Sequence, residues 1–206
     1  MRTVIVAAAA VACAAAAGAG ELSSPGGGRA LTAQQLQAVM PKLDAARANR
    51  LLKPLAAAMK EFDITTPKRQ AAFLAQVAHE CGELRYLEEM FSNLDAYENR
   101  ADLGNTRPGD GKKYKGRGPL MLTGRANYQA AGRALKLELE AKPDLVLEPE
   151  VGLRVAAWYW KAQGLNDLAD RGDFREITKR VHGDYAHLDA RQRYYRQARQ
   201  ALGLRD

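Results

Sequence analysis

The segment FLAQVAHECGELRYLEE, residues 73–89, decides how the chain is interpreted. It starts as an apolar run, reaches the carboxylate Glu80 and then meets a glycine, Gly82. On a helix Glu80 lies three residues after Val77 and seven after Phe73, so the three side chains share one face. A glutamate on an apolar face is expected to have a raised pKa through desolvation, which suits a general acid. The alternative is a residue at the helix end that simply reaches water.

A second carboxylate, Glu89, follows nine residues after Glu80. If the helix continued, Glu89 would point to the opposite side, since nine residues make about two and a half turns. Gly82 is a natural helix stop, so the chain can fold back and bring Glu89 across from Glu80. Two carboxyl groups, one buried and one wetter, are the groups that an enzyme uses to hydrolyse a glycosidic bond, and we expect Glu80 and Glu89 to be such a pair.

Helical signals precede this segment. Thr32, with a glutamine three residues later, forms a capping box that starts a first helix. A second helix is expected over about residues 44–62, bent or split by Pro54. Thr66 and Pro67 then provide an N-cap and a first-turn proline for the helix that reaches Glu80.

The middle of the chain breaks the helical pattern. Residues 92–120 include NTRPGDGKKYKGRGP, which is too rich in glycine, proline, asparagine and aspartate for a helix. Helical pattern returns at about Gly124, after Pro149, and over about residues 173–182 and 189–202. Long alternating strand patterns are missing. The sequence therefore predicts one mainly α domain over residues 31–206, with a glycine-rich central loop and little sheet.

The first 30 residues are expected to lie outside this domain. Residues 1–20 have the pattern of a signal peptide or weak signal anchor, because a basic start precedes an uncharged, alanine-rich run. Residues 21–30 have the composition of a linker. We expect export to the periplasm or the extracellular space, with transient membrane contact through residues 3–20 and a membrane tether before release. The alternative is a wrongly assigned start upstream of Leu31.

The net charge is +7, which suits a polyanionic partner such as a bacterial wall. Lysine and arginine are dispersed among acidic residues rather than clustered, so no nucleic-acid partner is expected. No cofactor or metal is expected either: His79 and Glu80 would begin a zinc-protease motif, but Glu83 stands where its second histidine is needed. His182 and His187 are too far apart in sequence to suggest a shared metal.

Two long motifs carry a resemblance to a known family. The segment 73–89, followed by YENRADLGNTRPGDGKKYKGRGPLMLTGRANY at residues 97–128, resembles the family-19 glycoside hydrolases. That family contains chitinases and wall-lysing endolysins of phages and bacteria. ITKRVHGDYAHLDARQRYYRQA, residues 177–198, is similar to the family's C-terminal segment. The resemblance runs from about Leu31 to Leu202 and implies a lysozyme-like helical fold.

The resemblance also implies roles for individual residues. Glu80 matches the catalytic acid and Glu89 the general base of an inverting reaction. Thr123 matches a hydroxyl residue that helps to hold the attacking water. Tyr114 and Asn127 match positions that contact sugar. Among nearby acids, Glu88 and Glu98 are rivals for the role of base, and Glu83 is expected to be solvated surface.

Arg191 matches an arginine that pairs with the catalytic acid, and the spacing supports this independently. The intervals of 4, 3 and 4 residues between Arg191, Tyr195, Ala198 and Leu202 place the arginine on an apolar helix face. An inward arginine needs a carboxylate partner, and Glu80 is the obvious one. The alternative is an arginine that reaches out to solvent from the helix start.

Three positions depart from the family pattern. Met121 replaces a sugar-contacting glutamine, and His182 replaces an asparagine, although a histidine still offers one hydrogen bond to substrate. Cys81, with Gly82 and Glu83, replaces a small residue and two glycines. Cys13 in the export segment and Cys81 beside the acid raise the hypothesis of thiol control. The alternative is that Cys81 fills space in the core.

These observations predict a secreted, monomeric hydrolase of β-1,4 links in polymers that contain N-acetylglucosamine. Peptidoglycan is favoured over chitin, because the chain is compact and basic and resembles short endolysins. The alternatives are a chitinase and a non-catalytic relative that binds wall or chitin.

Overall fold

The computed structural model describes residues 31–90 and 94–205, so the predicted export segment, the linker and Cys13 lie outside the described residues. The described part is mainly helical, as predicted, and its strand pairing is confined to isolated bridges within residues 88–122. The α-helices are α1 (Ala33–Val39), α2 (Ala45–Glu61), α3 (Pro67–Glu80), α4 (Asp110–Lys113), α5 (Arg125–Leu135), α6 (Pro149–Ala162), α7 (Leu165–Arg171), α8 (Phe174–His182) and α9 (Leu188–Ala201). The 3₁₀ turns are η1 (Leu94–Tyr97), η2 (Ala101–Leu103) and η3 (Pro143–Leu147).

The helix starts predicted before the central segment are confirmed. Thr32 and Gln35 form the capping box of α1, and the Thr66 side chain accepts a hydrogen bond from the Arg69 N–H at the start of α3. The predicted split at Pro54 is wrong, since α2 runs through it without interruption. The buried face of α2 packs against α6, and this packing outweighs the hydrogen bond that proline cannot make.

Two short helices were not predicted. The glycine-rich loop contains α4, so the expectation that this loop holds no helix is wrong. Glu98 stabilises the turn, because its carboxylate accepts hydrogen bonds from the N–H groups of Gly109 at 2.6 Å and Gly111 at 2.8 Å. The other is α7, whose seven residues are too few for a clear period. It is bounded by Gly164 and Gly172, both with positive φ.

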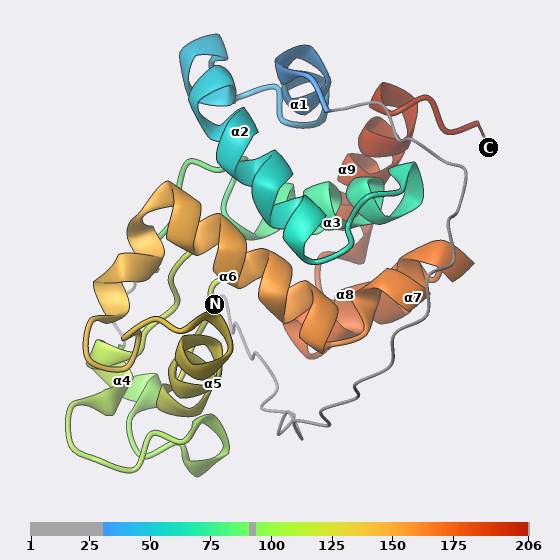
Figure 1. Cartoon of the computed structure of the whole chain (residues 1–206). Coiled ribbons are helices and arrows are strands. Elements are labelled where there is room, and N and C mark those ends of the chain that lie inside the picture. Colours follow the sequence, from blue (N-terminus) through green and yellow to red (C-terminus); the bar gives the residue numbers. More distant parts are fainter. Residues whose placement is uncertain (1–30, 91–93, 206) are drawn as a thin grey trace, which may run out of the picture.

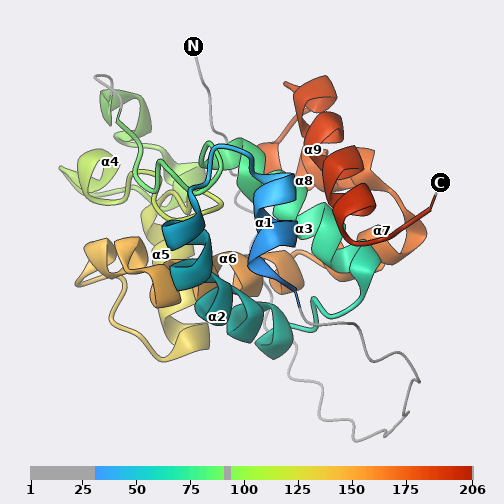
Figure 2. The same ribbon diagram turned by 90° about the horizontal axis from the view of Figure 1, so that it is seen from above.

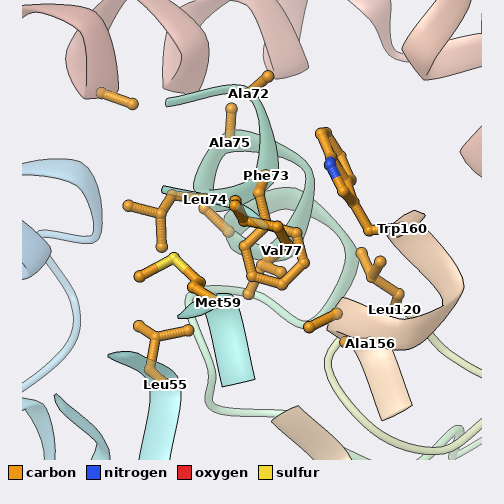
Figure 3. Packing of buried hydrophobic residues seen from close by; sticks show 14 of the residues in the cluster. Leu55, Met59, Ala72, Phe73, Leu74, Ala75, Val77, Leu120, Ala156 and Trp160 are labelled. Atoms are coloured by element: carbon orange, nitrogen blue, oxygen red, sulfur yellow. The ribbon is translucent and has the colours of Figure 1, made fainter. Parts of the chain in front are cut away.

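The helix α3 lies at the centre of the molecule, between α4 and α5 on one side and the group α7, α8 and α9 on the other (Figures 1 and 2). Every residue from 71 to 78 is buried, because α1, α2, α6, α7, α8 and α9 surround the main core that this helix crosses. Figure 3 shows Phe73 of α3 against Trp160 of α6, with their ring centroids 5.3 Å apart and the planes at 81°. No helix among residues 31–90 and 94–205 combines the length and the apolar character needed to cross a membrane.

A second, smaller core lies beneath α5. It contains Tyr114, Leu122 and Tyr128 and draws on α6 and η3 as well. Phe62 and Trp158 are partly buried and pack against both cores. The segment from Tyr114 to Leu122 also runs between them, since its Leu120 and Met121 belong to the main core. The loop that carries the predicted site residues is therefore attached to both halves of the molecule.

Candidate active site

Glu80 is the last residue of α3, and its side chain is only 7% exposed. The helix stops because the backbone beyond Cys81 turns back: the Cys81 carbonyl accepts hydrogen bonds from the N–H groups of Arg85, at 3.1 Å, and Tyr86, at 2.9 Å. Gly82 has a φ of 57°, which is the left-handed conformation expected after a helix end. The predicted reversal of the chain after Glu80 is therefore present.

Glu80 is paired with Arg191, as the sequence predicted. The Nη1 atom of Arg191, in the first turn of α9, lies 2.6 Å from Glu80 Oε1, and the arginine side chain is 1% exposed. The same nitrogen donates a hydrogen bond of 2.5 Å to Oε1 of Gln76, one turn earlier on α3. Gln76 in turn donates to the Thr178 hydroxyl at 2.9 Å. This chain of polar contacts joins α9, α3 and α8 through the core and holds Glu80 in one place.

The negative charge of Glu80 affects the pKa of Tyr159 on α6. Burial raises the pKa of the Tyr159 hydroxyl, and the Glu80 carboxylate raises it further. The hydroxyl donates to the Arg180 carbonyl at 3.0 Å. Tyr159 therefore stays protonated and contributes an apolar ring and a fixed dipole beside the acid.

Glu89 is also buried, with 7% of the residue exposed, so the expectation that the second carboxylate is the wetter one is wrong. Its partners differ from those of Glu80. Tyr97 donates its hydroxyl to Oε1 at 2.8 Å, and the Gly116 N–H donates to Oε2 at 3.0 Å. Burial raises the pKa of Tyr97, and the hydrogen bond to Glu89 adds to this, so the phenol remains a donor. Two neutral donors thus hold the Glu89 carboxylate, in contrast to the cation that holds Glu80.

Thr123 lies beside Glu89 across Gly116. A Cβ added to Gly116 would lie 3.0 Å from Glu89 Oε2 and 3.2 Å from Thr123 Oγ1, so both oxygens pack closely against the Gly116 backbone. The Thr123 hydroxyl donates to the Met121 carbonyl at 2.8 Å. Asn127 donates to the Thr123 carbonyl at 2.7 Å and so steadies this turn. The structure therefore brings Glu89, Thr123 and Asn127 together around the loop at Gly116.

The rival carboxylates have other partners. Glu88 forms ion pairs with Lys115 at 3.1 Å and with Arg117 at 3.4 Å. Glu98 stabilises α4 through its two backbone hydrogen bonds. The expectation that Glu83 is solvated surface is wrong, since it is 3% exposed. Glu83 points inward because the Lys42 N–H, between α1 and α2, and the Tyr194 hydroxyl, on α9, donate hydrogen bonds to its carboxylate.

Tyr114 does not lie where a sugar could reach it. Its side chain is fully buried in the second core, next to Tyr128, with the two ring centroids 5.4 Å apart. The hydroxyl donates to the Glu140 carbonyl at 3.0 Å. The predicted sugar contact of Tyr114 has no support in this structure, because packing and this hydrogen bond occupy the whole side chain.

His182 and Met121 are also buried, at 9% and 7% exposure. The His182 Nδ1 atom lies 2.8 Å from Asp184 Oδ1. The pKa of Asp184 is lowered, first by a hydrogen bond from the Ala186 N–H and then by His182. This contact fixes the orientation of the imidazole ring, and the predicted contact of His182 with sugar stays a prediction. Met121 belongs to the main core, where a thioether packs without needing a polar partner.

Cys81 is completely buried, and its thiol donates to the Val77 carbonyl at 3.0 Å. Burial raises the pKa of this thiol to about 12, so the reactive thiolate does not form at neutral pH. These observations favour the interpretation that Cys81 fills space. Its proposed partner, Cys13, lies outside the described residues.

Three supporting residues were missed by the sequence analysis: Gln76, Tyr97 and Gly116. A signal existed for Gln76, a lone amide in an apolar run, four residues before Glu80 and hence on the same face. Tyr97 and Gly116 lie in the irregular region, where spacing does not show which groups meet. Within residues 31–90 and 94–205, no group of three or more His, Cys, Asp or Glu side chains is placed to hold a metal ion.

Comparison with known proteins identifies the family to which the chain is similar. The family model described as chitinase class I matches residues 47–169, more than half of the chain. Endochitinase At2g43620 of Arabidopsis thaliana is 35% identical over 159 residues, which are 72% of this chain and 54% of that protein. A glycosyl hydrolase family 19 domain-containing protein of Haemophilus influenzae is 30% identical over 159 residues, 62% of this chain and 77% of that protein. The chain therefore spans about half the length of the plant relative.

Solved structures agree with the sequence relatives. Chitinase C from Streptomyces griseus HUT6037 matches with a TM-score of 0.72 and 27% identity, over 87% of this chain and 96% of that structure. The maize family 19, class IV chitinase matches with a TM-score of 0.62 over 74% of this chain and 81% of that one. The chain belongs to the family-19 glycoside hydrolases, the chitinase class I family, and has their lysozyme-like helical fold.

Proposed function

We propose that this protein hydrolyses β-1,4 links in polymers of N-acetylglucosamine, with inversion at the anomeric carbon. The observation that carries the proposal is the contrast between two nearly buried carboxylates: Glu80 is held by a cation, and Glu89 is held by neutral donors. Inverting glycosidases need one carboxyl group on each face of the sugar, about 6.5–9.5 Å apart, with room for a water.

Glu80 is proposed as the general acid. Arg191 contacts Oε1, which leaves Oε2 as the oxygen that carries the proton to the leaving glycosidic oxygen. As the bond between the sugar and that oxygen breaks, Glu80 becomes a carboxylate again, and the guanidinium stabilises the new negative charge at no cost of reorganisation. The buried network through Gln76 keeps Arg191 in position for this step.

Glu89 is proposed as the general base. Its Oε2 and the Thr123 hydroxyl both lie beside Gly116, so a water bound between them would be held by the hydroxyl oxygen and would lose its proton to the carboxylate. The water attacks the sugar from the face opposite to the leaving group, and Glu89 takes up the proton. The hydrogen bonds from Tyr97 and Gly116 keep the Glu89 carboxylate in a fixed orientation while its charge changes.

Chitin is the polymer that the named relatives favour, since three of them are called an endochitinase or a chitinase. The sequence favoured peptidoglycan, and this remains a second candidate because of the net charge of +7. A groove of about 500 Å³ over α4 and α5 supports it, because four cations and two carboxylates line it, and three of the cations remain to attract an anionic polymer after Arg125 has paired with Asp110 and Glu140. The cations are Arg107, Lys113, Arg125 and Arg133.

The test compares the purified full chain with its Glu80→Gln variant on glycol chitin and on purified peptidoglycan, side by side. Proton NMR of the products should show the α-anomer first, as inversion of a β link requires. Cleavage of glycol chitin alone would identify a chitinase, and cleavage of peptidoglycan alone would identify an endolysin. If wild type and variant were equally inactive on both, while polymer still pulled the protein down, the non-catalytic binding role would replace this proposal.

We further propose that residues 1–20 direct export and that the exported protein acts as a monomer. The alanine-rich run after Arg2 supports the first statement. Mass spectrometry of the protein recovered from the periplasm and medium would reveal an N-terminus beyond residue 20. Recovery of the intact chain from the cytoplasm alone would contradict export.

A further inference from the structure

Three consecutive residues directly after Cys81 adopt the left-handed conformation: Gly82 with φ 57°, Glu83 with φ 64° and Leu84 with φ 61°. Glycine enters this region freely, but for glutamate and leucine it is strained. Such strain persists only where surrounding contacts impose the conformation, and it concentrates at functional sites. The contacts that impose it here lie three residues from Glu80.

The Glu83 side chain is one of these contacts. It is 3% exposed, and each of its oxygens accepts a hydrogen bond from a different part of the fold. Oε2 binds the backbone N–H of Lys42, between α1 and α2, at 2.5 Å. Oε1 binds the hydroxyl of Tyr194, on α9, at 2.8 Å. A buried carboxylate bound by two neutral donors loses both if the backbone leaves its strained conformation, so these bonds hold that conformation.

The two carboxylates at the end of α3 bind the same helix. Glu80 binds Arg191 at 2.6 Å, and Glu83 binds Tyr194 at 2.8 Å. The spacing is three residues on each side, so the contacts lie about one turn apart along α9. Arg191 also binds Gln76, one turn earlier on α3, but Gln76 and Glu80 both precede the chain reversal that follows this helix. The Glu83–Tyr194 contact adds a tether to α9 beyond the helix end, on the strained segment itself.

We propose that Glu83 is a positioning residue for the general acid: it holds the end of α3 on α9 so that the Glu80 carboxyl keeps its place on Arg191. The proposal rests on the function proposed for Glu80, but the geometry it describes can be tested without a substrate. The hydrogen bonds of Glu83 come from Lys42 and Tyr194 and not from the guanidinium of Arg191, so Glu83 acts on Glu80 through the backbone.

The chain offers variants that separate positioning from stability. Glu83→Gly removes the tether and at the same time relieves the strained backbone, so its loss of activity should exceed its loss of stability. Tyr194→Phe removes one donor and keeps the ring. Tyr195→Phe is the matched control, because this neighbouring ring stacks on Phe174 at 4.2 Å and the change deletes only a hydroxyl.

Two readouts are needed. The first is the separate measurement of kcat and KM on glycol chitin or peptidoglycan. Loss of a hydrogen bond to a buried carboxylate should lower kcat about tenfold in Glu83→Gly and about threefold in Tyr194→Phe, with KM within about twofold. The second is the carboxyl carbon resonance of Glu80 in protein labelled with ¹³C-glutamate, assigned by its loss in Glu80→Gln. This resonance should move in both variants and stay in place in Tyr195→Phe.

A folded Glu83→Gly protein with kcat within about twofold of wild type and an unmoved Glu80 resonance would overturn the proposal. If Glu83→Gly does not fold, Tyr194→Phe carries the same test, and an unmoved resonance with unchanged kcat overturns it. If wild type itself is inactive on both polymers, the proposed function fails and the resonance alone decides the positioning role.

Discussion

Glu80 and Arg191 form an ion pair that is almost completely removed from water, with 2.6 Å between the contacting atoms and exposures of 7% and 1%. Removal of one partner leaves an uncompensated buried charge. Arg191→Met should therefore lower the free energy of unfolding by about 3–5 kcal/mol, measured by denaturant titration. The double variant Glu80→Gln/Arg191→Met has no buried charge and should recover much of that loss. A double variant less stable than Arg191→Met would contradict this account of the pair.

Tyr97→Phe removes the hydroxyl that binds Glu89 Oε1. The ring remains, so the free energy of unfolding should fall by no more than about 1.5 kcal/mol. The effect on kcat should be larger, because the Glu89 carboxylate loses one of the two donors that orient it. We expect kcat to fall about tenfold with little change in KM. Steady-state kinetics of the variant checks this, and an unchanged kcat would mean that Gly116 alone holds the base.

Gly116→Ala would place a methyl group 3.0 Å from Glu89 Oε2 and 3.2 Å from Thr123 Oγ1. The methyl group crowds the two oxygens proposed to hold the attacking water and must displace them, so kcat should fall at least 100-fold, a change of about 2.7 kcal/mol in the barrier. Gly109→Ala is a useful control, since nothing lies within 4 Å of its added Cβ. That control has a φ of 85°, so it should lose stability but keep kcat.

The buried thiol of Cys81 makes the free energy of unfolding depend on pH in the alkaline range. Burial raises the pKa of the thiol from 9.0 to about 12, so the folded state holds its proton more tightly than the unfolded state does. The contribution is fully present below pH of about 9 and is lost as pH rises toward 12. Between pH 8 and pH 10 the wild type should lose about 1.4 kcal/mol more than Cys81→Ala, as measured by urea unfolding. Rapid alkylation of the folded wild type by iodoacetamide at pH 8 would refute the burial argument.

The ion pair of Asp110 with Arg125 makes the free energy of unfolding depend on pH in the acid range. The hydrogen bonds from Arg125, at 2.5 Å and 2.8 Å, hold the pKa of Asp110 below its ordinary value of 3.8. Its contribution is present above that value and is lost as pH falls through the lower pKa of the folded state. Asp110→Asn should cost about 2–3 kcal/mol at pH 7, and the gap to wild type should close below pH of about 3.8. A gap that stayed constant down to pH 2 would rule out this linkage.

The sequence predicted the long helices well because their starts are local signals. Thr32, Asp44 and Thr66 each cap a helix with their own side chain, so a few neighbouring residues carry the information. The helices α4 and α7 were missed, since four and seven residues do not build a periodic pattern. Their boundaries depend on left-handed glycines and, for α4, on a carboxylate 11 residues away from the bound N–H.

For the candidate site, the sequence located the groups that sit on helices. The apolar neighbours of Glu80 and Arg191 predicted that both point inward, which supported the pairing that the family resemblance implied. Tyr114 was misjudged because a tyrosine in a glycine-rich loop looks accessible, and only the fold shows that it is packed beneath α5. Glu83 was misjudged for a related reason: its partners are 41 and 111 residues away in sequence.

The two cores bear on the distance between the proposed acid and the proposed base. Glu80 is anchored in the core around α3 and α9, whereas the hydrogen-bond partner of Glu89, Gly116, belongs to the segment that starts in the second core at Tyr114. Phe62 and Trp158 pack against both cores and so join the two halves. A substitution at either residue therefore acts at a distance on the spacing of the two carboxylates, although neither residue belongs to the candidate site.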